Sequence, residues 1–243
     1  GFYPHEDLTK PTDRIIGYRS LIHPDGDWSS LQQADVASWH GMMTSVVAAG
    51  NGGKSNGFYR GIAPDANVVL VKLAKTGRIT EQNIQDGLEW VLRHRTRFNI
   101  RIVNISAGGD FEQSYLHDSL SQTVEECVSL GLTIVCAVGN AGHLPNHPVF
   151  PPASAPSAIA VGGLDDNNSI NRAKRGMYRS SYGPTLDGLQ KPEIIAPSIW
   201  IPAPILPDTP TAQEAELLEK LDKAADNELH EIIRQNPNID AEL

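Results

Sequence analysis

Short apolar runs alternate with amphipathic stretches between Asn67 and Val161, and this alternation limits the possible folds more than any other feature of the sequence. Such runs are typical of strands covered on both faces, and the stretches between them carry apolar residues at helical spacing. The predicted strands are 67–73, 100–105, 132–138 and 157–161, and the predicted helices are 80–93 and a second one that carries Leu116 to Val128 and ends at Gly131. The sequence therefore predicts an α/β fold, βαβαβ, with a mainly parallel sheet and helices on both faces.

Three loops follow the predicted strands, at 74–78, 106–109 and 139–142. Ligands of open parallel sheets bind in the crevice beyond the carboxyl ends of the strands. The second and the third of these loops contain two glycines each, where the backbone can approach a ligand closely. Asn51–Ser55 has a Gly-Lys-Ser sequence, but it follows a helix-like run, which is the wrong context for a phosphate loop. We therefore favour an extended peptide as the ligand over a nucleotide, which is the weaker alternative.

The charge of the chain is concentrated at one end. Nine acidic and three basic residues lie between Thr211 and Leu243, so this stretch carries six of the nine net negative charges of the protein. A nucleic-acid partner would require a clustered basic face, which the sequence lacks, and no apolar run has the length of a membrane span. Cys127 and Cys136 have neither a metal-site nor a disulfide spacing and are predicted to be buried free thiols.

A change of composition near Pro197 indicates a boundary. Residues 201–210 are rich in proline, and the stretch from Thr211 to Gln235 has one apolar face that is interrupted near Ala225. We predict one helix or two helices there. The predicted organisation is a domain at 1–205 and a proline-rich connection with an acidic helical insertion at 206–243, packed on the domain as a hairpin or lid. A partner-binding segment is the alternative, since an amphipathic acidic helix is compatible with either.

Five sequence blocks resemble the subtilisin-like serine peptidases in order and spacing. The first, HGMMTSVVAAG from His40 to Gly50, resembles the family's histidine motif, although Met42 and Met43 replace its usual Thr-His. The second block, RGIAPDA at 60–66, resembles the loop before the next strand, and the third, VNISAGG at 103–109, resembles a strand that pairs with substrate. The fourth block, CAVGNAG at 136–142, resembles the oxyanion-hole block. The fifth, SSYGPTLDGLQKPEIIAP at 180–197, resembles the stretch before the nucleophile.

The resemblance implies a three-layer α/β/α subtilisin-like fold and a serine endopeptidase that acts on peptides or proteins. It implies that His40 is the general base and that the Asn140 amide stabilises the tetrahedral oxyanion. It places substrate backbone and the specificity pocket at Ser106, Ala107, Gly108 and Gly139. Members are often secreted and often bind calcium; no cofactor is expected otherwise, and no acidic loop here has an assignable calcium spacing.

The two other members of the catalytic triad are missing from the quoted blocks. Gly1–Leu8 resembles the sequence just after the family's aspartate, which would lie two residues before Gly1. No Gly-Thr-Ser block follows Pro197, and Ser198 stands where the family has a structural glycine. The sequence therefore predicts that residues 1–243 alone are inactive. The alternative is a non-catalytic relative, a peptide-binding or regulatory module with the same fold.

Several titratable residues have simpler interpretations. Asp35 is the carboxylate nearest to His40 in sequence, but we expect it to face solvent. His143 and His147 are predicted to lie in a surface loop, because no carboxylate or cysteine joins them at a metal-site spacing. His5 and Asp7 are expected to have a local structural role. No residue of this group is therefore a predicted ligand or catalytic group.

Overall fold

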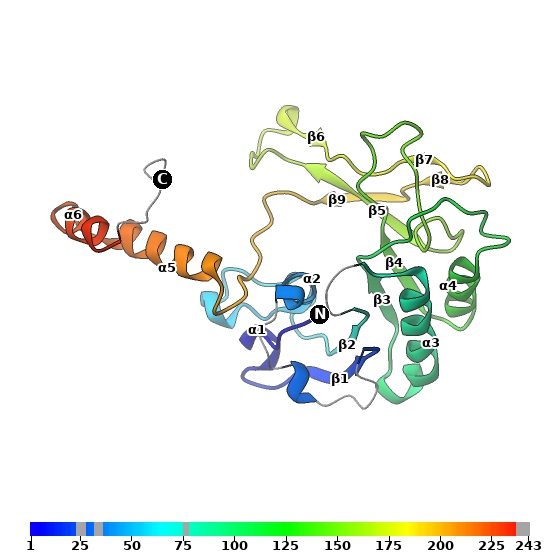
Figure 1. The fold of residues 1–243 in the computed structure, drawn as a ribbon, viewed down its shortest axis with the longest axis horizontal. Helices are drawn as coiled ribbons and strands as arrows, with labels where there is room; N and C mark the ends of the chain where they lie inside the picture. The colour runs from blue at the N-terminus through cyan, green and yellow to red at the C-terminus, as the bar shows by residue number, and fades with distance from the viewer. Residues whose placement is uncertain (23–27, 32–35, 75–77, 237–243) are drawn as a thin grey trace.

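The computed structural model describes residues 1–22, 28–31, 36–74 and 78–236 (Figure 1). Its largest sheet runs β3-β4-β5-β6, with β9 also paired to β5. The pairs β3–β4, β4–β5 and β5–β9 are parallel, and only β6 is antiparallel. These strands are β3 (Ile102–Ile105), β4 (Thr133–Ala137), β5 (Ile159–Asp165), β6 (Gly176–Met177) and β9 (Ile194–Pro197). The predicted mainly parallel α/β fold is confirmed.

A second, smaller sheet pairs β1 (Ile15–Ser20) with β2 (Val68–Lys72), again in parallel. The strand at β1 was not predicted, and β2 pairs with it rather than with β3. The described strands thus form separate parallel sheets where the alternation of the sequence suggested one. A short antiparallel hairpin of β7 (Gly183–Pro184) and β8 (Gln190–Lys191) forms the third sheet.

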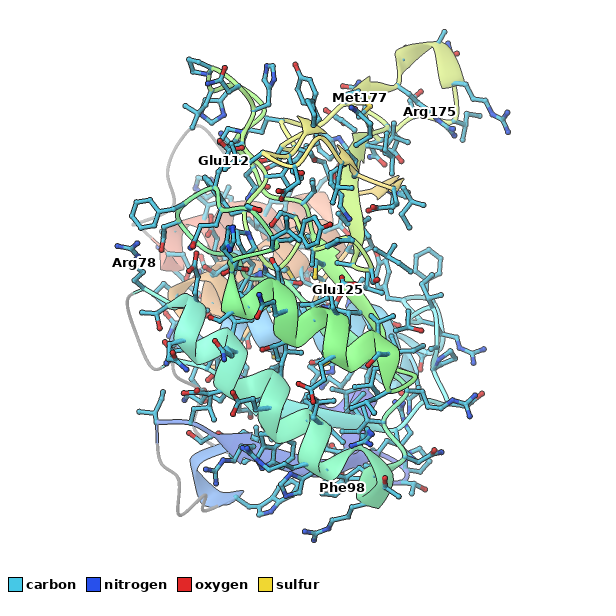
Figure 2. All side chains as sticks on the ribbon, turned by 90° about the vertical axis from the view of Figure 1, so that its right-hand side faces the viewer. Arg78, Phe98, Glu112, Glu125, Arg175 and Met177 are labelled. Atoms are coloured by element: carbon cyan, nitrogen blue, oxygen red, sulfur yellow. The ribbon has the colours of Figure 1, made fainter. Side chains whose placement is uncertain are left out.

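Two helices, α3 (Glu81–Phe98) and α4 (Ser119–Ser129), lie side by side on one face of the larger sheet (Figure 2). Thr80 begins α3 with a capping box, since its hydroxyl accepts from the Asn83 N–H at 3.2 Å. The predicted apolar faces of both helices are buried in one core with β3, β4 and β5, except for Leu116. The prediction was wrong for this residue, because α4 begins only at Ser119 and Leu116 is exposed in the loop before it. Each fully buried Leu, Ile or Val stabilises this layer by about 1.5–3 kcal/mol.

The same core contains both cysteines. Cys127 and Cys136 are free and fully buried, as the sequence predicted. Burial raises the pKa of Cys127 to about 11 and that of Cys136 to about 12. Thiols in such surroundings are unreactive and have a packing role.

A second core lies between the small sheet and two helices, α1 (Glu6–Thr9) and α2 (Trp39–Ala49). Met42, Val46 and Ala49 are its contribution from α2. Gly41 allows the amino-terminal segment to cross this helix closely, because a Cβ at this position would fall 2.0 Å from the Gly1 carbonyl oxygen. Leu206, which follows β9 in the chain, also enters this core.

Short 3-10 turns complete the described structure. They are η1 (Trp28–Leu31), η2 (Val36–Ser38), η3 (Gly53–Ser55) and η4 (Arg172–Lys174).

The acidic carboxyl-terminal stretch forms two helices, α5 (Pro210–Lys223) and α6 (Asp226–Gln235), with the break where the sequence predicted one. The pair projects from the body as an arm (Figure 1). Neither helix has a buried residue. The expected packing of this stretch against the domain is therefore not seen, since its apolar residues are spread along a face that remains partly exposed. Among the described residues, no helix has both the length and the apolar content to cross a membrane.

Candidate functional site

His40 is the second residue of α2 and lies at the solvent-exposed amino-terminal end of this helix. Its side chain is exposed and meets the Trp39 ring edge-on, with 6.3 Å between the ring centroids. Partial burial lowers the pKa of His40 below the ordinary value of 6.5, and the positive charge of the Gly1 α-amino group lowers it further. No described carboxylate bonds to the imidazole. Asp35 lies outside the described residues.

The protonation of His40 should respond to the chemical state of the amino terminus. We expect the His40 pKa in the 243-residue chain to lie below 6.5, because burial and the α-amino charge both disfavour the imidazolium. The α-amino group, with an ordinary pKa of about 7.7–8.0, is still cationic in this range. Acetylation of Gly1 should therefore raise the pKa of His40. An NMR titration of the histidine ring protons measures the His40 pKa before and after acetylation. An unchanged pKa would contradict the contribution of the α-amino charge.

The loops after β3 and β4 meet at one cavity of about 340 Å³. Ser106, Gly139 and Asn140 line it, so the structure brings together three of the predicted substrate and oxyanion residues. Ala107 and Gly108 follow Ser106 in the same loop but do not line the cavity, and neither does His40. The Asn140 side chain is exposed and can donate to a bound ligand.

A serine that the sequence analysis did not single out fixes the backbone of the loop after β4. Gly139 has a φ of +106°, and the Ser181 N–H donates to its carbonyl at 3.0 Å. The Ser181 hydroxyl accepts from the Ala141 N–H at 3.1 Å. A Cβ on Gly139 would lie 2.8 Å from that hydroxyl, so glycine is required by both conformation and space. These contacts fix the backbone on both sides of Asn140.

Ser198 also lines the cavity, yet its contacts are structural. Its hydroxyl donates to the Leu164 carbonyl at 3.2 Å, and its N–H donates to the same oxygen at 3.0 Å. No histidine contacts it among the described residues. This environment agrees with the sequence-based view that Ser198 replaces a glycine rather than acting as a nucleophile.

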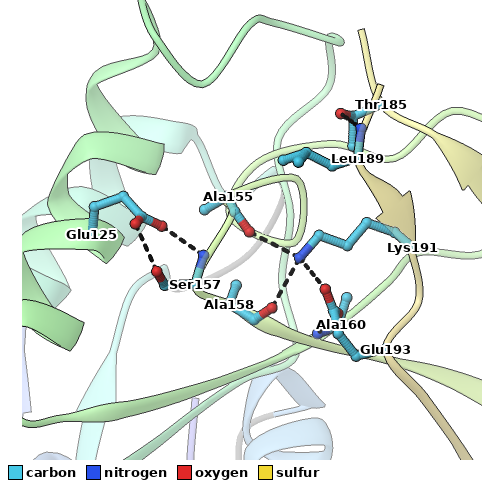
Figure 3. Close-up of polar contacts among 9 residues, drawn as sticks. All are labelled: Glu125, Ala155, Ser157, Ala158, Ala160, Thr185, Leu189, Lys191 and Glu193. Atoms are coloured by element: carbon cyan, nitrogen blue, oxygen red, sulfur yellow. Dashed lines mark hydrogen bonds and ion pairs between the residues drawn. The ribbon is translucent and has the colours of Figure 1, made fainter. Parts of the chain in front are cut away.

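A buried ammonium group supports the wall of this region, and sequence reasoning missed it. The Lys191 side chain is 1% exposed, and its Nζ donates to the carbonyls of Ala155 and Ala158, each at 2.9 Å, and to Glu193 Oε1 at 2.6 Å (Figure 3). Glu193 Oε2 accepts from the Ala160 N–H at 2.7 Å. The ammonium thereby joins β8 to the turn before β5.

One of the two histidines of the 139–150 loop, His147, contacts an aromatic side chain. His147 stacks on Tyr182, with ring centroids 3.9 Å apart, and its Nε2 is 2.8 Å from the Tyr182 hydroxyl. Within the described ranges, no cluster of three or more His, Cys, Asp or Glu side chains could hold a metal ion. The structure therefore offers no calcium or zinc site to assign among those residues.

Comparison with known proteins identifies the family of this chain. The model of the subtilase family, Peptidase_S8, matches residues 1–225. The chain belongs to the subtilase family. Its membership accounts for the sequence blocks around His40 and Asn140 and for the mainly parallel sheet. This subtilase departs from the family's histidine motif at Met42, which lies fully buried in the second core.

Two relatives from Bacillus subtilis (strain 168) and one solved structure illustrate the similarity. Serine protease AprX is 35% identical over 209 residues, or 83% of this subtilase and 45% of AprX. Minor extracellular protease Epr is 31% identical over 172 residues, or 70% of this chain and 23% of Epr. The structure of Sphericase matches with a TM-score of 0.58 and 21% identity, covering 84% of this chain and 70% of its own. The chain thus spans less than half the length of these two curated relatives.

Proposed function

We propose that this subtilase is the core of a serine endopeptidase that hydrolyses peptide bonds through an acyl-enzyme. The observation that carries the proposal is the subtilase sequence match together with the cavity that Asn140 and Ser106 share at the carboxyl edge of the sheet. In this mechanism a serine attacks the scissile carbonyl, and His40 takes its proton and returns it to the leaving amine. Burial lowers the pKa of His40, and this favours the neutral imidazole that can accept that proton.

Asn140 is the proposed donor to the tetrahedral oxyanion. Its amide is exposed at the cavity, and the backbone beside it is fixed through Ser181. A donor aimed at the developing negative charge lowers the barrier without reorganising during the reaction, and one such donor contributes about 10²–10³ in kcat. Ser106, Ala107, Gly108 and Gly139 are proposed to bind substrate backbone and to wall the specificity pocket.

The remaining triad members are proposed to come from sequence outside residues 1–243. The chain at Gly1 passes directly over the residue after His40, since the Gly1 carbonyl occupies the space of a Gly41 side chain. A residue two positions upstream lies within about 7 Å of Gly1, given that extended chain spans about 3.3–3.6 Å per residue. An aspartate there could reach the imidazole. The serine has no candidate in the printed sequence after Pro197 other than Ser198.

We also propose a division of this chain into a peptidase region, 1–205, and an appended arm, 206–243. The support is that the body contains the described sheets and nearly all buried apolar residues, whereas α5 and α6 bury none. Leu206, the first residue of the proposed arm, is the last of the described residues in the second core.

The function is tested by assaying two lengths of the protein with a fluorogenic peptide and a serine-directed phosphonate. We expect residues 1–243 to show neither cleavage nor labelling. A longer chain, with the sequence upstream of Gly1 and downstream of Leu243, should cleave the peptide and be labelled at a serine outside 1–243. Specific labelling of Ser198 would overturn the assignment, and peptide binding without hydrolysis by the longer chain would favour the non-catalytic module.

A further inference from the structure

The loop between β3 and α4, residues 106–118, carries three of the four proposed substrate-binding residues but has little apolar burial, to which Ala107 contributes by packing against the core of α3 and α4. It contains neither helix nor strand. Its large apolar side chains Phe111 and Leu116 are 66% and 58% exposed. Figure 2 shows this loop, marked by Glu112, beyond the first turns of α3 and α4. Polar contacts must therefore hold it in place.

A carboxylate from a distant part of the chain makes the strongest of these contacts. Asp187 Oδ1 accepts from the Ser114 hydroxyl at 2.6 Å, and Asp187 Oδ2 accepts from the Tyr115 N–H at 2.9 Å. The two partners lie 72 and 73 residues away along the chain. Both carboxylate oxygens are thus used on adjacent residues of the loop, which fixes the position and the direction of its backbone.

Asp187 is itself held rigidly. It lies in the turn between β7 and β8, where the Thr185 N–H donates to Leu189 at 2.9 Å and the Gly188 N–H donates to Thr185 at 2.8 Å. The hairpin ends at Lys191, whose buried ammonium anchors it to the turn before β5. One short hairpin therefore supports both walls of the cavity region.

The other contacts of the loop are single hydrogen bonds or exposed ion pairs. The Gln113 amide donates to Glu81 Oε2 at 3.3 Å, and the Gln122 amide donates to the Leu116 carbonyl at 2.8 Å. The Gly109 N–H donates to the Pro151 carbonyl at 2.7 Å, which fixes a single point of the backbone. Arg78 pairs with Asp110, but both side chains are well exposed, and exposed ion pairs hold a loop weakly. Asp187 is thus the contact whose loss should free the loop.

We propose that Asp187 is a positioning residue for peptide binding: it holds the 106–118 loop so that Ser106, Ala107 and Gly108 present their backbone to an extended substrate. This inference rests on the proposed peptidase function. A substrate that spans the loop should therefore depend on Asp187, whereas one too short to reach it should not.

The kinetic test uses the longer chain and its Asp187→Ala variant with two substrates that share the residue before the scissile bond. We expect the KM of an acetyl-tetrapeptide p-nitroanilide to rise about tenfold, equivalent to about 1.4 kcal/mol, with kcat within twofold. The ester of the single acetylated residue should be hydrolysed as before. Asp187→Asn should restore most of the affinity, because its amide can accept from Tyr115 and donate to Ser114. Equal losses on both substrates would overturn the proposal.

Glu125 provides a matched control. Its carboxylate also binds one serine, since Oε1 accepts from the Ser157 N–H and Oε2 from the Ser157 hydroxyl, both at 2.7 Å (Figure 3). Glu125→Ala removes the same types of hydrogen bond from a position that does not line the cavity. Its KM for the tetrapeptide should stay at the parent value even if its stability falls.

Hydrogen–deuterium exchange separates this inference from the proposed function. In the 243-residue chain, Asp187→Ala should speed exchange across 106–118, while Glu125→Ala should not. Unchanged exchange in that loop would overturn the positioning role, whatever the activity. Absence of hydrolysis by the parent longer chain would instead contradict the proposed function, and the exchange result would still decide whether Asp187 fixes the loop.

Discussion

Replacement of His40 by alanine in the longer chain is expected to lower its proposed peptidase activity, measured as kcat/KM, by about 10⁴- to 10⁶-fold, the range for loss of one member of a serine peptidase triad. The reason is that no other described group at the head of α2 can take the proton from the attacking serine. The exposed position of the His40 side chain implies little cost to folding. Initial rates with the fluorogenic peptide and thermal unfolding of both proteins measure the two effects.

His230→Ala is the control for the His40 variant, because His230 is an exposed histidine of α6 on the projecting arm. It should keep the parent activity. Activity of the His40 variant within tenfold of the parent, in a protein of unchanged stability, would remove His40 from the mechanism. The close passage of the amino-terminal segment over Gly41 would then no longer support an upstream aspartate as the partner of His40.

Replacement of Lys191 by methionine is expected to lower the free energy of unfolding by about 1–3 kcal/mol, the cost of leaving a buried acceptor without its donor, because the Glu193 side chain is itself 36% exposed. Methionine has a similar length but no charge and no donor. The Ala155 and Ala158 carbonyls would lose their shared donor, and Glu193 would lose its counter-charge. Urea unfolding of the 243-residue chain, followed by circular dichroism, measures the loss.

Lys223→Met is the matched control for this prediction. Lys223 pairs with Glu219 on α5, where both side chains are largely exposed, so its replacement should not change the urea midpoint measurably. The contrast isolates burial as the cause, since both variants remove a lysine from a Lys–Glu pair. Equal midpoints for the two variants would show that the oxygen atoms around Lys191 are satisfied by water instead.

The elements that the sequence predicted best are those with regular apolar spacing. The start of α3 at Thr80 and the strands β3 and β4 agree with the structure because capping chemistry and apolar runs are local signals. The helix continues to Phe98, beyond the predicted Arg93, because Arg95 and Arg97 extend its last turn with polar residues. Local patterns thus identify an element more reliably than its end.

Contacts between distant residues were not predictable in the same way. β1 escaped detection because Gly17 and Arg19 interrupt its apolar pattern, and its pairing with β2 depends on the fold. In the local sequence pattern, Lys191 and Asp187 are simply polar residues of a turn-rich stretch. Their partners lie 33 or more residues away, apart from Glu193, so nothing local marked them as structural.

The two hydrophobic cores have a consequence for cooperativity. Met42 and Val46, next to His40 in the chain, belong to one core, whereas Cys136 and Val138, next to Asn140, belong to the other. β2 contacts both: Leu70 is buried in the second core, with Met42 and Val46, whereas Val69 and Val71 pack against the core that contains Cys136. The proposed base and the proposed amide donor therefore rest on different potential unfolding units, and local opening of either one would separate them. In this molecule the alignment of the two groups can last only as long as the less stable unit stays closed.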